Sequence, residues 1–299
     1  MTYTQQAGRV RLPPGRAVAV AVTFDFDALA VWDGTFGVRG PAWTSRGEFG
    51  AEVAVPRLLR LLDRHGVTST WFVPGHTADT FPAACRDVIA AGHEVAHHGY
   101  AHENPLAVDR DGERAVLLKG LAALERIGVR PRGYRSPAWD VSEHTLDLLA
   151  ELGFDWDSSL MANDVHPYRP RLWRPGSLVP HGGRDVAGSA SVPGVPSPVL
   201  EIPVSWFLDD FPTQEVTPGA PRVMVAPSAL EERWTAILDF AATQETGAVY
   251  VLTLHPQTIG RPHLVGVLDR LLAHATQVGG APMTLSEVAD ATVLADPTT

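Results

Sequence analysis

Runs of apolar and β-branched residues alternate along this chain with segments of helical spacing, and this alternation constrains the possible folds most strongly. The strand-like runs span residues 17–27, 68–75, 94–98, 132–139, 200–207 and 248–256. Apolar residues at helical spacing mark the segments 55–66, 81–91, 110–128, 142–152, 227–242 and 263–278. Such alternation predicts an α/β fold with a mainly parallel sheet flanked by helices.

The length and composition favour one large domain. The chain has 299 residues, of which 45% are hydrophobic, and α/β barrels of this size commonly form a single domain. Residues 165–198 are rich in Pro and Gly and lack periodicity, which predicts a long loop or a set of short edge segments. We therefore expect a single domain over residues 1–299.

The charge balance and the apolar runs exclude several classes of partner. The chain has 24 Lys and Arg residues against 34 Asp and Glu, a net charge of −10 without a basic run, so we expect no nucleic-acid partner. The longest apolar run, near Val18 to Val22, is too short to span a bilayer, and no secretory signal is evident. We expect a cytoplasmic protein without a membrane contact, in which the single cysteine, Cys85, is structural.

Polar side chains gather where the strand-like runs end. In parallel α/β sheets and barrels the carboxyl ends of the strands meet at one edge, where functional sites form. Capping of strands at turns is the alternative interpretation, and it explains one such case more readily than five. The residues are Asp25 and Asp27, His97 and His98, Arg135, Asp157, and His255.

Asp25 and Asp27 end the first of these runs, in the order Thr23-Phe24-Asp25-Phe26-Asp27. Residues two apart in a strand face the same side, so both carboxylates can point toward one site. Two like charges that close are unfavourable unless a cation or a shared proton relieves them. The alternative is a pair of acids that merely ends the strand at a turn.

Four histidines lie within ten residues, in the segment His93-Glu-Val-Ala-His97-His98-Gly-Tyr-Ala-His102. The i, i+4 spacing of His98 and His102 predicts two imidazoles on one face of a helical turn. Zinc and similar metals favour such imidazoles with a carboxylate as third ligand and one position open for water. A surface histidine cluster is the alternative interpretation.

Two later motifs add an arginine and a further histidine. Arg135 ends a strand-like run, where it can bind a carboxylate bidentately, and Trp139 is placed to form an apolar wall. His255 also stands at a strand end, where a histidine can act as a general acid. Taken singly, a structural ion pair, a packed tryptophan or a strand cap would explain these residues.

The ordered set T-F-D-F-D, H-G-Y-A-H, R-S-P-A-W and L-T-L-H-P resembles the polysaccharide deacetylase superfamily, also called carbohydrate esterase family four. The stretches HEVAHHGYAHENP, DSSLMANDVHPYR and LEIPVSWFLDD resemble a cytoplasmic branch of peptidoglycan-deacetylase-like proteins, allantoinases and imidases. The resemblance covers residues 15–290. It implies a distorted (β/α) barrel of about seven parallel strands.

The resemblance also implies a role for each motif residue. Asp25 corresponds to the catalytic base, Arg135 to the arginine that orients it, and His255 to the general acid. One divalent metal ion is implied, with zinc expected and cobalt, nickel or iron also suited to the donor set. The metal ligands correspond to Asp27, His98 and His102.

Substrate contacts are expected from the ends of the barrel strands and from loop 161–190, which fits a structural or subunit-interface role equally well. Loops 28–50 and 161–190 would set the pocket shape. The implied reaction is attack by metal-activated water, with an oxyanion stabilised by the metal and a backbone N–H near Tyr134. The candidate contacts are Tyr134, Trp139, Asn163, Asp164 and Arg169.

Three positions distinguish the chain within the superfamily. Phe26 separates the two acids, as in the cytoplasmic branch, whereas many members have adjacent acids. His97 stands where secreted deacetylases usually have Asn, and we interpret it as a structural hydrogen-bonding residue, with a substrate contact as the alternative. Some allantoinase-type relatives lack the second histidine and work without metal, so the presence of His102 favours a metal site.

Three hypotheses for function follow, two of which describe hydrolases of non-peptide C–N bonds. The first is removal of an N-acetyl group from an amino sugar or similar linear amide, and the second is hydrolysis of a cyclic imide or ureide. The third, a non-catalytic binding protein, conflicts with the retention of Asp25, Arg135 and His255 together. The expected substrate is a small molecule or glycan, and relatives in this branch form tetramers, so we expect a homo-oligomer, either a dimer or a tetramer.

Overall fold

The computed structural model describes residues 7–174, 179–181, 184–186, 192–219 and 224–295. At its centre lies a parallel sheet with the strand order β11-β6-β5-β4-β3-β2-β12. The strands are β2 (Val18–Asp25), β3 (Thr70–Val73), β4 (Glu94–His97), β5 (Gly133–Tyr134), β6 (Trp156–Asp157), β11 (Leu200–Glu201) and β12 (Val249–Leu254).

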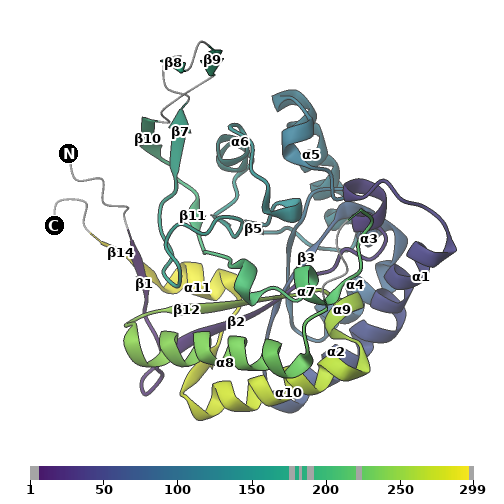
Figure 1. The fold of residues 1–299 in the computed structure, drawn as a ribbon, viewed down its shortest axis with the longest axis vertical. Coiled ribbons are helices and arrows are strands. Elements are labelled where there is room, and N and C mark those ends of the chain that lie inside the picture. Colours follow the sequence, from purple (N-terminus) through teal and green to yellow (C-terminus); the bar gives the residue numbers. More distant parts are fainter. Residues whose placement is uncertain (1–6, 175–178, 182–183, 187–191, 220–223, 296–299) are drawn as a thin grey trace.

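The sheet curls into an open, distorted barrel with helices on its outer side (Figure 1). The predicted α/β barrel of seven parallel strands is thereby confirmed. The outer helices are α2 (Val55–His65), α4 (Pro82–Ala90), α5 (Arg110–Arg126), α6 (Thr145–Leu152), α8 (Pro227–Gln244), α10 (Pro262–Gln277) and α11 (Leu285–Ala291). Shorter helices in the connections after β2, β3, β11 and β12 are α1 (Pro41–Glu48), α3 (Gly75–Thr80), α7 (Phe211–Gln214) and α9 (Pro256–Ile259).

Strand β2 organises the core, because both of its edges are paired and all eight of its residues are buried. Strand β12 pairs along one edge, while β13 (Gly280–Pro282) and β3 share the other. Phe24 of β2 stacks on Trp71 of β3, with ring centroids 4.3 Å apart. The continuous apolar run that precedes Asp25 is therefore what a parallel strand covered on both faces requires.

The barrel is not closed by a ladder between β11 and β12, the two ends of the strand order. Instead, a single bridge joins Asp209 to Thr253, and the Asp210 N–H donates to the carbonyl oxygen of Thr253 at 3.3 Å. This bridge places the segment after β11 beside the end of β12. It therefore brings residues 209–210 to the same edge of the barrel as the ends of β2 and β4.

Two predicted strands are much shorter than their sequence patterns. Only Gly133–Tyr134 of the segment 132–139 is a strand, because Pro137 begins a 3-10 turn in which Ala138 and Trp139 have positive φ angles of 52° and 57°. Only Leu200–Glu201 of the segment 200–207 is a strand, and a 3-10 turn follows at Trp206–Leu208. In both cases the chain leaves the sheet at the edge where the polar residues gather.

The connections carry additional short elements. Segment 28–50, predicted only as a loop, contains α1 and π-helical turns at Val31–Thr35 and, at its end, Phe49–Ala54. The prediction of short edge segments within 165–198 is confirmed where the structure describes it, in two antiparallel pairs. Those pairs join β7 (Arg171–Arg174) with β10 (Val192–Pro196), and β8 (Val179–His181) with β9 (Arg184–Val186); β1 (Gly8–Val10) pairs with β14 (Thr292–Leu294).

Candidate active site

The polar residues at the strand ends converge at the carboxyl edge of the barrel. Asp25 is the last residue of β2, His97 is the last of β4, and His255 directly follows β12. The side chains that face one another here are all buried, with at most 7% exposure. Six residues that are far apart in the sequence thus lie together in one site, as the sequence predicts. They are Asp25, Asp27, His98, His102, Arg135 and His255.

Asp27, His98 and His102 offer one ligand atom each within 4.8 Å of one another, which is the spacing of a metal site. Oδ1 of Asp27 lies 3.5 Å from Nε2 of His98 and 3.6 Å from Nε2 of His102. Both Asp27 oxygens and Nε2 of His98 are buried and have no hydrogen-bond partner among the described residues. Buried polar atoms are almost always partnered, so these three atoms fit a cation.

Hydrogen bonds at the far side of each imidazole orient the two histidines. Nδ1–H of His98 donates to the carbonyl oxygen of Arg135 at 2.7 Å. Nδ1–H of His102 donates to the Thr35 hydroxyl at 2.5 Å, and that hydroxyl donates to the His102 carbonyl oxygen at 3.2 Å. Both Nε2 atoms are thus left unprotonated and directed at Asp27, as in protein sites that ligate metals through histidine.

The prediction of a helical turn between His98 and His102 is wrong. The chain from the end of β4 is irregular here, with positive φ angles at Gly99 (69°) and His102 (61°). The Gly99 N–H donates to Nδ1 of His97 at 3.1 Å. The two imidazoles lie together without a helical turn, with ring centroids 5.0 Å apart.

Arg135 holds the carboxylate of Asp25 through Nη1, at 2.7 Å from Oδ1. Nη1 also donates to the Thr23 hydroxyl, and the guanidinium lies over the Phe72 ring at 4.0 Å. Burial would raise the pKa of Asp25, but the charges of Arg135, His98 and His255 outweigh burial and lower it. Asp25 is therefore kept ionised beside the Asp27 cluster, with Oδ2 3.9 Å from Nε2 of His98.

His255 faces the carboxylates of Asp25 and Asp27. Its Nε2 lies 3.8 Å from Oδ2 of Asp27 and 4.0 Å from Oδ2 of Asp25. Its Nδ1 lies 2.8 Å from Oδ1 of Asp210 and 3.6 Å from Oδ1 of Asp209. Burial alone would lower the pKa of His255, but these carboxylates raise it to about 10, so the ring is protonated.

Asp209 and Asp210 were not predicted as site residues, although they follow a strand-like run as the other acids do. Asp209, Asp210 and His255 also satisfy the spacing of a metal site. The Asp210 carboxylate, however, already accepts from the His255 backbone N–H and lies at hydrogen-bond distance from the ring. The charged histidine thus satisfies these acids without an ion.

An apolar cavity of about 110 Å³ opens onto these groups. Trp139, as predicted, forms one wall, and Trp206 packs against it with ring centroids 4.1 Å apart. Residues of the π-helical turn and of α7 complete the lining. The lining residues are Asp25, Asp27, Val31, His102, Ala138, Trp139, Trp206, Asp209, Phe211 and His255.

The structure does not place the other predicted substrate residues in this cavity. Tyr134 is 2% exposed and packs with Leu117 and Leu146 between the sheet and its outer helices. The amides that follow it, at Arg135 and Ser136, already donate to the His97 carbonyl and to the Ser159 hydroxyl. A backbone donor next to Tyr134 is thus in use, contrary to the prediction.

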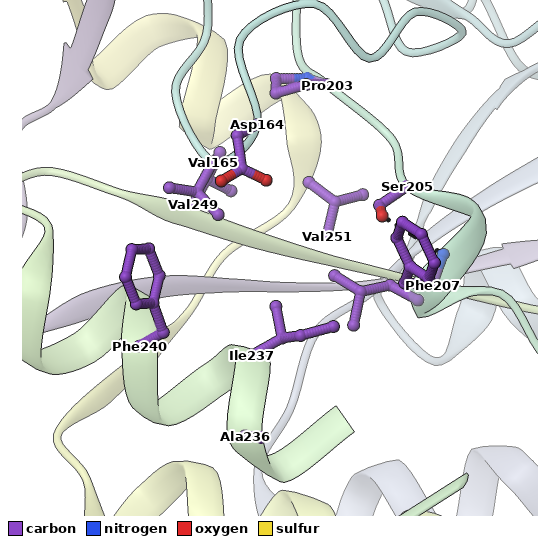
Figure 2. A pocket seen from close by; sticks show the side chains of 11 residues that line it. Asp164, Val165, Pro203, Ser205, Phe207, Ala236, Ile237, Phe240, Val249 and Val251 are labelled. Carbon is purple, nitrogen blue, oxygen red and sulfur yellow. Dashed lines mark hydrogen bonds between the residues drawn. The ribbon is translucent and has the colours of Figure 1, made fainter. Parts of the chain in front are cut away.

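Asn163, Asp164 and Arg169 lie away from the cavity, because the chain turns at Asp164 (φ 50°) and runs back beside the start of β12. The carbonyl oxygen of Val165 there accepts from the Val249 N–H at 2.8 Å. Asp164 instead lines an apolar pocket of about 280 Å³ between this turn, β12 and α8 (Figure 2). Parts of loop 161–190, residues 175–178, 182–183 and 187–190, lie outside the described residues.

His97 has the structural arrangement that the sequence favoured. Its Nε2–H donates to the Leu117 carbonyl oxygen of α5 at 3.0 Å, and its Nδ1 accepts from Gly99. Gly120 of α5 packs directly on this ring, where a Cβ would lie 2.3 Å from Nε2. Both ring nitrogens are thus committed to the backbone, and the residue anchors the end of β4.

Comparisons with known proteins agree with this geometry. Residues 17–156 match the family described as polysaccharide deacetylase. The chain is 35% identical over 282 residues to the peptidoglycan deacetylase of Helicobacter pylori, which spans 92% of this chain and 96% of that protein. A Mycobacterium smegmatis crystal structure, described as a polysaccharide deacetylase, has a TM-score of 0.80 at 37% identity, covering 94% of this chain and 92% of that one.

A more distant structure, Puue allantoinase, shares the fold with a TM-score of 0.73 at 21% identity and covers 93% of this chain and 91% of that one. In the part of the chain that the structure describes, no helix has both the length and the apolarity needed to cross a bilayer. On the strength of the Helicobacter relative, which is matched over almost its whole length, the chain belongs to the polysaccharide deacetylase family.

Proposed function

We propose that this chain is a metal-dependent deacetylase that hydrolyses the N-acetyl amide of an amino-sugar glycan. One observation carries the proposal: three unpartnered ligand atoms converge beside an ionised carboxylate and face a protonated histidine. A metal-dependent amide hydrolase uses all three parts, namely a cation site, a base and an acid. The 35% identical peptidoglycan deacetylase supports the choice of an N-acetylated glycan.

Asp27, His98 and His102 would hold the divalent cation. Zinc suits two imidazoles and one carboxylate, and cobalt, nickel and iron suit the same donors. When bound, such an ion supplies Lewis acidity toward the amide carbonyl and toward an attacking water. Its charge would also compensate Asp27, whose pKa burial raises well above the usual value.

Asp25 is the proposed general base. Arg135, whose Nη1 also donates to the Thr23 hydroxyl, binds Oδ1 of the carboxylate, and the other oxygen, Oδ2, faces the site. A base must be ionised when the water arrives, and the lowered pKa of Asp25 provides this state at neutral pH. Asp25 would then accept a proton from the attacking water.

His255 is the proposed general acid. Asp210 holds Nδ1, so the proton on Nε2 points toward the cavity, where the departing nitrogen would lie. Amide cleavage needs this proton because the nitrogen then leaves as a neutral amine rather than as a strongly basic amide anion. The base and the acid thus both line the cavity, and their ionisation states are set by their different partners.

A cyclic imide or ureide is the second candidate substrate, and the size of the cavity is compatible with it. About 110 Å³ between Trp139 and Trp206 accommodates a small planar ring as well as an acetyl group. The same base and acid would open a ring by attack at one carbonyl and protonation of the ring nitrogen. The non-catalytic alternative is disfavoured, since binding alone requires neither an ionised base nor a protonated acid.

A hydrolysis panel tests the proposal. N-acetylglucosamine oligomers are compared with succinimide, hydantoin and allantoin, and metal content is measured on the same sample. We expect acetate release from the oligomers, loss of that activity on chelation, and its return with zinc or cobalt. Ring opening without acetate release would select the second candidate, and full activity in metal-free protein would overturn metal dependence.

A further inference from the structure

A second pair of buried acids lies next to the site and has no part in the proposed reaction. Asp157 ends β6 and Glu201 ends β11, and these two residues are direct partners in the parallel register. Both side chains are 0% exposed. We call them the carboxyl pair. Two adjacent carboxylates without a cation are unfavourable in such a setting, so their contacts decide what the pair does.

Two of the four oxygens in the carboxyl pair have hydrogen-bond donors, and the other two have none among the described residues. Oε1 of Glu201 accepts the backbone N–H groups of Ser159 and Leu160, both at 2.9 Å. Oδ1 of Asp157 accepts the Ser159 hydroxyl at 2.7 Å. Oδ2 of Asp157, like Oε2 of Glu201, is buried and has no donor among the described residues. One proton held between these last two oxygens would satisfy both.

The charges around the pair indicate which group carries that proton. Burial raises the pKa of Glu201 well above its usual value, and the negative charge of Asp157 raises it further. The pKa of Asp157 rises less, to about 6, since the Arg135 charge and hydrogen bonds oppose burial. Glu201 is therefore the donor and Asp157 the acceptor.

The carboxyl pair is connected to the base through two consecutive serines. Arg135 donates from Nε to the Ser158 carbonyl oxygen at 2.9 Å and from Nη2 to the Ser158 hydroxyl at 3.0 Å. The next residue, Ser159, is the one whose N–H and hydroxyl the carboxyl pair holds, and its hydroxyl oxygen also accepts the Ser136 N–H at 2.8 Å. The carboxyl pair thus holds Ser159 and, through it, the Ser136 N–H. These two residues directly follow Ser158 and Arg135 in the chain.

We propose that the carboxyl pair shares one proton and, through the two serines, positions Arg135 for its contact with Asp25. The pair touches neither the cavity nor the proposed metal ligands, so its members are positioning residues. A neutral Glu201 side chain that still donates toward Asp157 preserves the arrangement. A side chain without polar atoms breaks it, because two backbone N–H groups and one carboxylate oxygen lose their partner.

The shared proton is tested by infrared spectroscopy on wild type and Glu201→Gln at neutral pH. We expect the difference spectrum to show loss of a protonated-carboxyl carbonyl stretch that shifts in D2O. Glu113→Gln is the control, because Glu113 is also buried but its carboxylate accepts from Ser142 and Thr145. Loss of carboxylate bands in the Glu201→Gln spectrum would overturn the shared proton.

The positioning role is tested by NMR of the arginine Nε–H groups. The Arg135 signal should stay in place in Glu201→Gln and move or lose exchange protection in Glu201→Leu. Arg132, whose Nε donates to Asp155 at 2.7 Å on the surface, serves as the internal control and should not move. An unmoved Arg135 signal in Glu201→Leu would overturn the positioning role. If that variant does not fold, Ser159→Ala breaks the same link and replaces it.

Turnover supplies a third readout, which rests on the proposed function. We expect Glu201→Leu to lower kcat by at least about tenfold, with KM and metal content unchanged, because small displacements of catalytic groups are costly. Glu201→Gln should restore kcat, whereas wild-type kcat in Glu201→Leu would contradict the inference. If the wild type itself hydrolyses no amide or imide, the proposed function fails, while the infrared and NMR results still decide the inference.

Discussion

Each of the three histidines in the candidate site has one ring nitrogen bonded to an orienting partner and the other directed at the carboxylates. The orienting partners of His98, His102 and His255 are a carbonyl, a hydroxyl and a carboxylate, respectively. His97 differs, because both of its nitrogens are used by the backbone. The carboxylate partner suits His255 to the proposed role of acid, while neutral partners suit the other two to the proposed role of ligands.

Substitutions at Asp25 and at His98 distinguish the role of the proposed base from that of the proposed cation site. We expect Asp25→Asn to lower kcat by about 10²- to 10⁴-fold, the usual contribution of a general base, and to keep its metal. His98→Ala should lose both metal and turnover. Steady-state kinetics and metal analysis on the same preparations check this prediction, and equal metal loss in the two variants would contradict the division of roles.

Individual elements contribute to the site by where they end rather than by their length. Strand β5 has two residues and β11 has two, yet their ends position Arg135 and the carboxyl pair. The left-handed conformations of Ala28, His102, Ala138 and Trp139 all occur in turns at this edge of the barrel. Such backbone is costly for non-glycine residues and is often found at functional sites.

Helix α5 supports β4 through Gly120. A Cβ there would lie 2.3 Å from Nε2 of His97 and 2.6 Å from the Gly99 carbonyl oxygen, so Gly120→Ala should cost about 1–3 kcal/mol of unfolding free energy. Gly266→Ala in α10 is the matched control, because its Cβ would meet only the end of the Arg270 side chain at 3.2 Å. The control should gain about 1 kcal/mol from helix propensity. Urea unfolding measures both, and equal signs would contradict the role of Gly120.

The 3-10 turn Trp206–Leu208 is predicted to determine substrate affinity. Trp206 packs on Trp139 in the cavity wall, and an aromatic contact of this kind contributes about 0.5–1.5 kcal/mol, so Trp206→Ala should raise KM by roughly 3- to 10-fold. Its neighbour Phe207 is more exposed, at 64%, and lines the other pocket. Phe207→Ala should therefore leave KM unchanged. Steady-state kinetics on both variants decide whether the two neighbours differ.

At the scale of the whole molecule, the sequence predicted the parts that depend on order along the chain. The alternation of patterns predicted the parallel sheet flanked by helices, the family resemblance implied the barrel, and the strand ends indicated Asp25, Asp27, His98, Arg135 and His255. It did not predict Asp209 and Asp210, because their place beside His255 depends on the bridge to Thr253 across the open side of the barrel. Asp164 was misplaced for a similar reason: the direction of the chain after its turn is set by pairing with β12, and no local pattern encodes that.

The carboxyl pair should also affect how stability depends on pH. The pKa of Asp157 is raised by burial from 3.8 to about 6, so the folded chain holds this proton more tightly than the unfolded chain. Its contribution to stability is therefore present at low pH and lost as the pH rises through 6. Between about pH 5 and pH 8, the wild type should lose at least about 1.4 kcal/mol relative to the double variant Asp157→Asn/Glu201→Gln, because Asp157 alone contributes this amount and Glu201, whose pKa is raised well above its usual value, adds a loss of the same sign. Urea unfolding at the two pH values measures this difference, and parallel changes in both proteins would count against it.

The residues that match the family, 17–156, contain Asp25, Asp27, both proposed histidine ligands and Arg135, whereas Asp209, Asp210 and His255 lie beyond them. With the proposed roles, ion binding and water activation depend on one part of the chain and leaving-group protonation on a later part. Substitutions in the later part would abolish activity in a relative without lowering its affinity for the metal ion. Active and inactive relatives should therefore be distinguished by the residues at the positions of Asp209, Asp210 and His255. Zinc affinity would not distinguish them, because both groups would bind the ion.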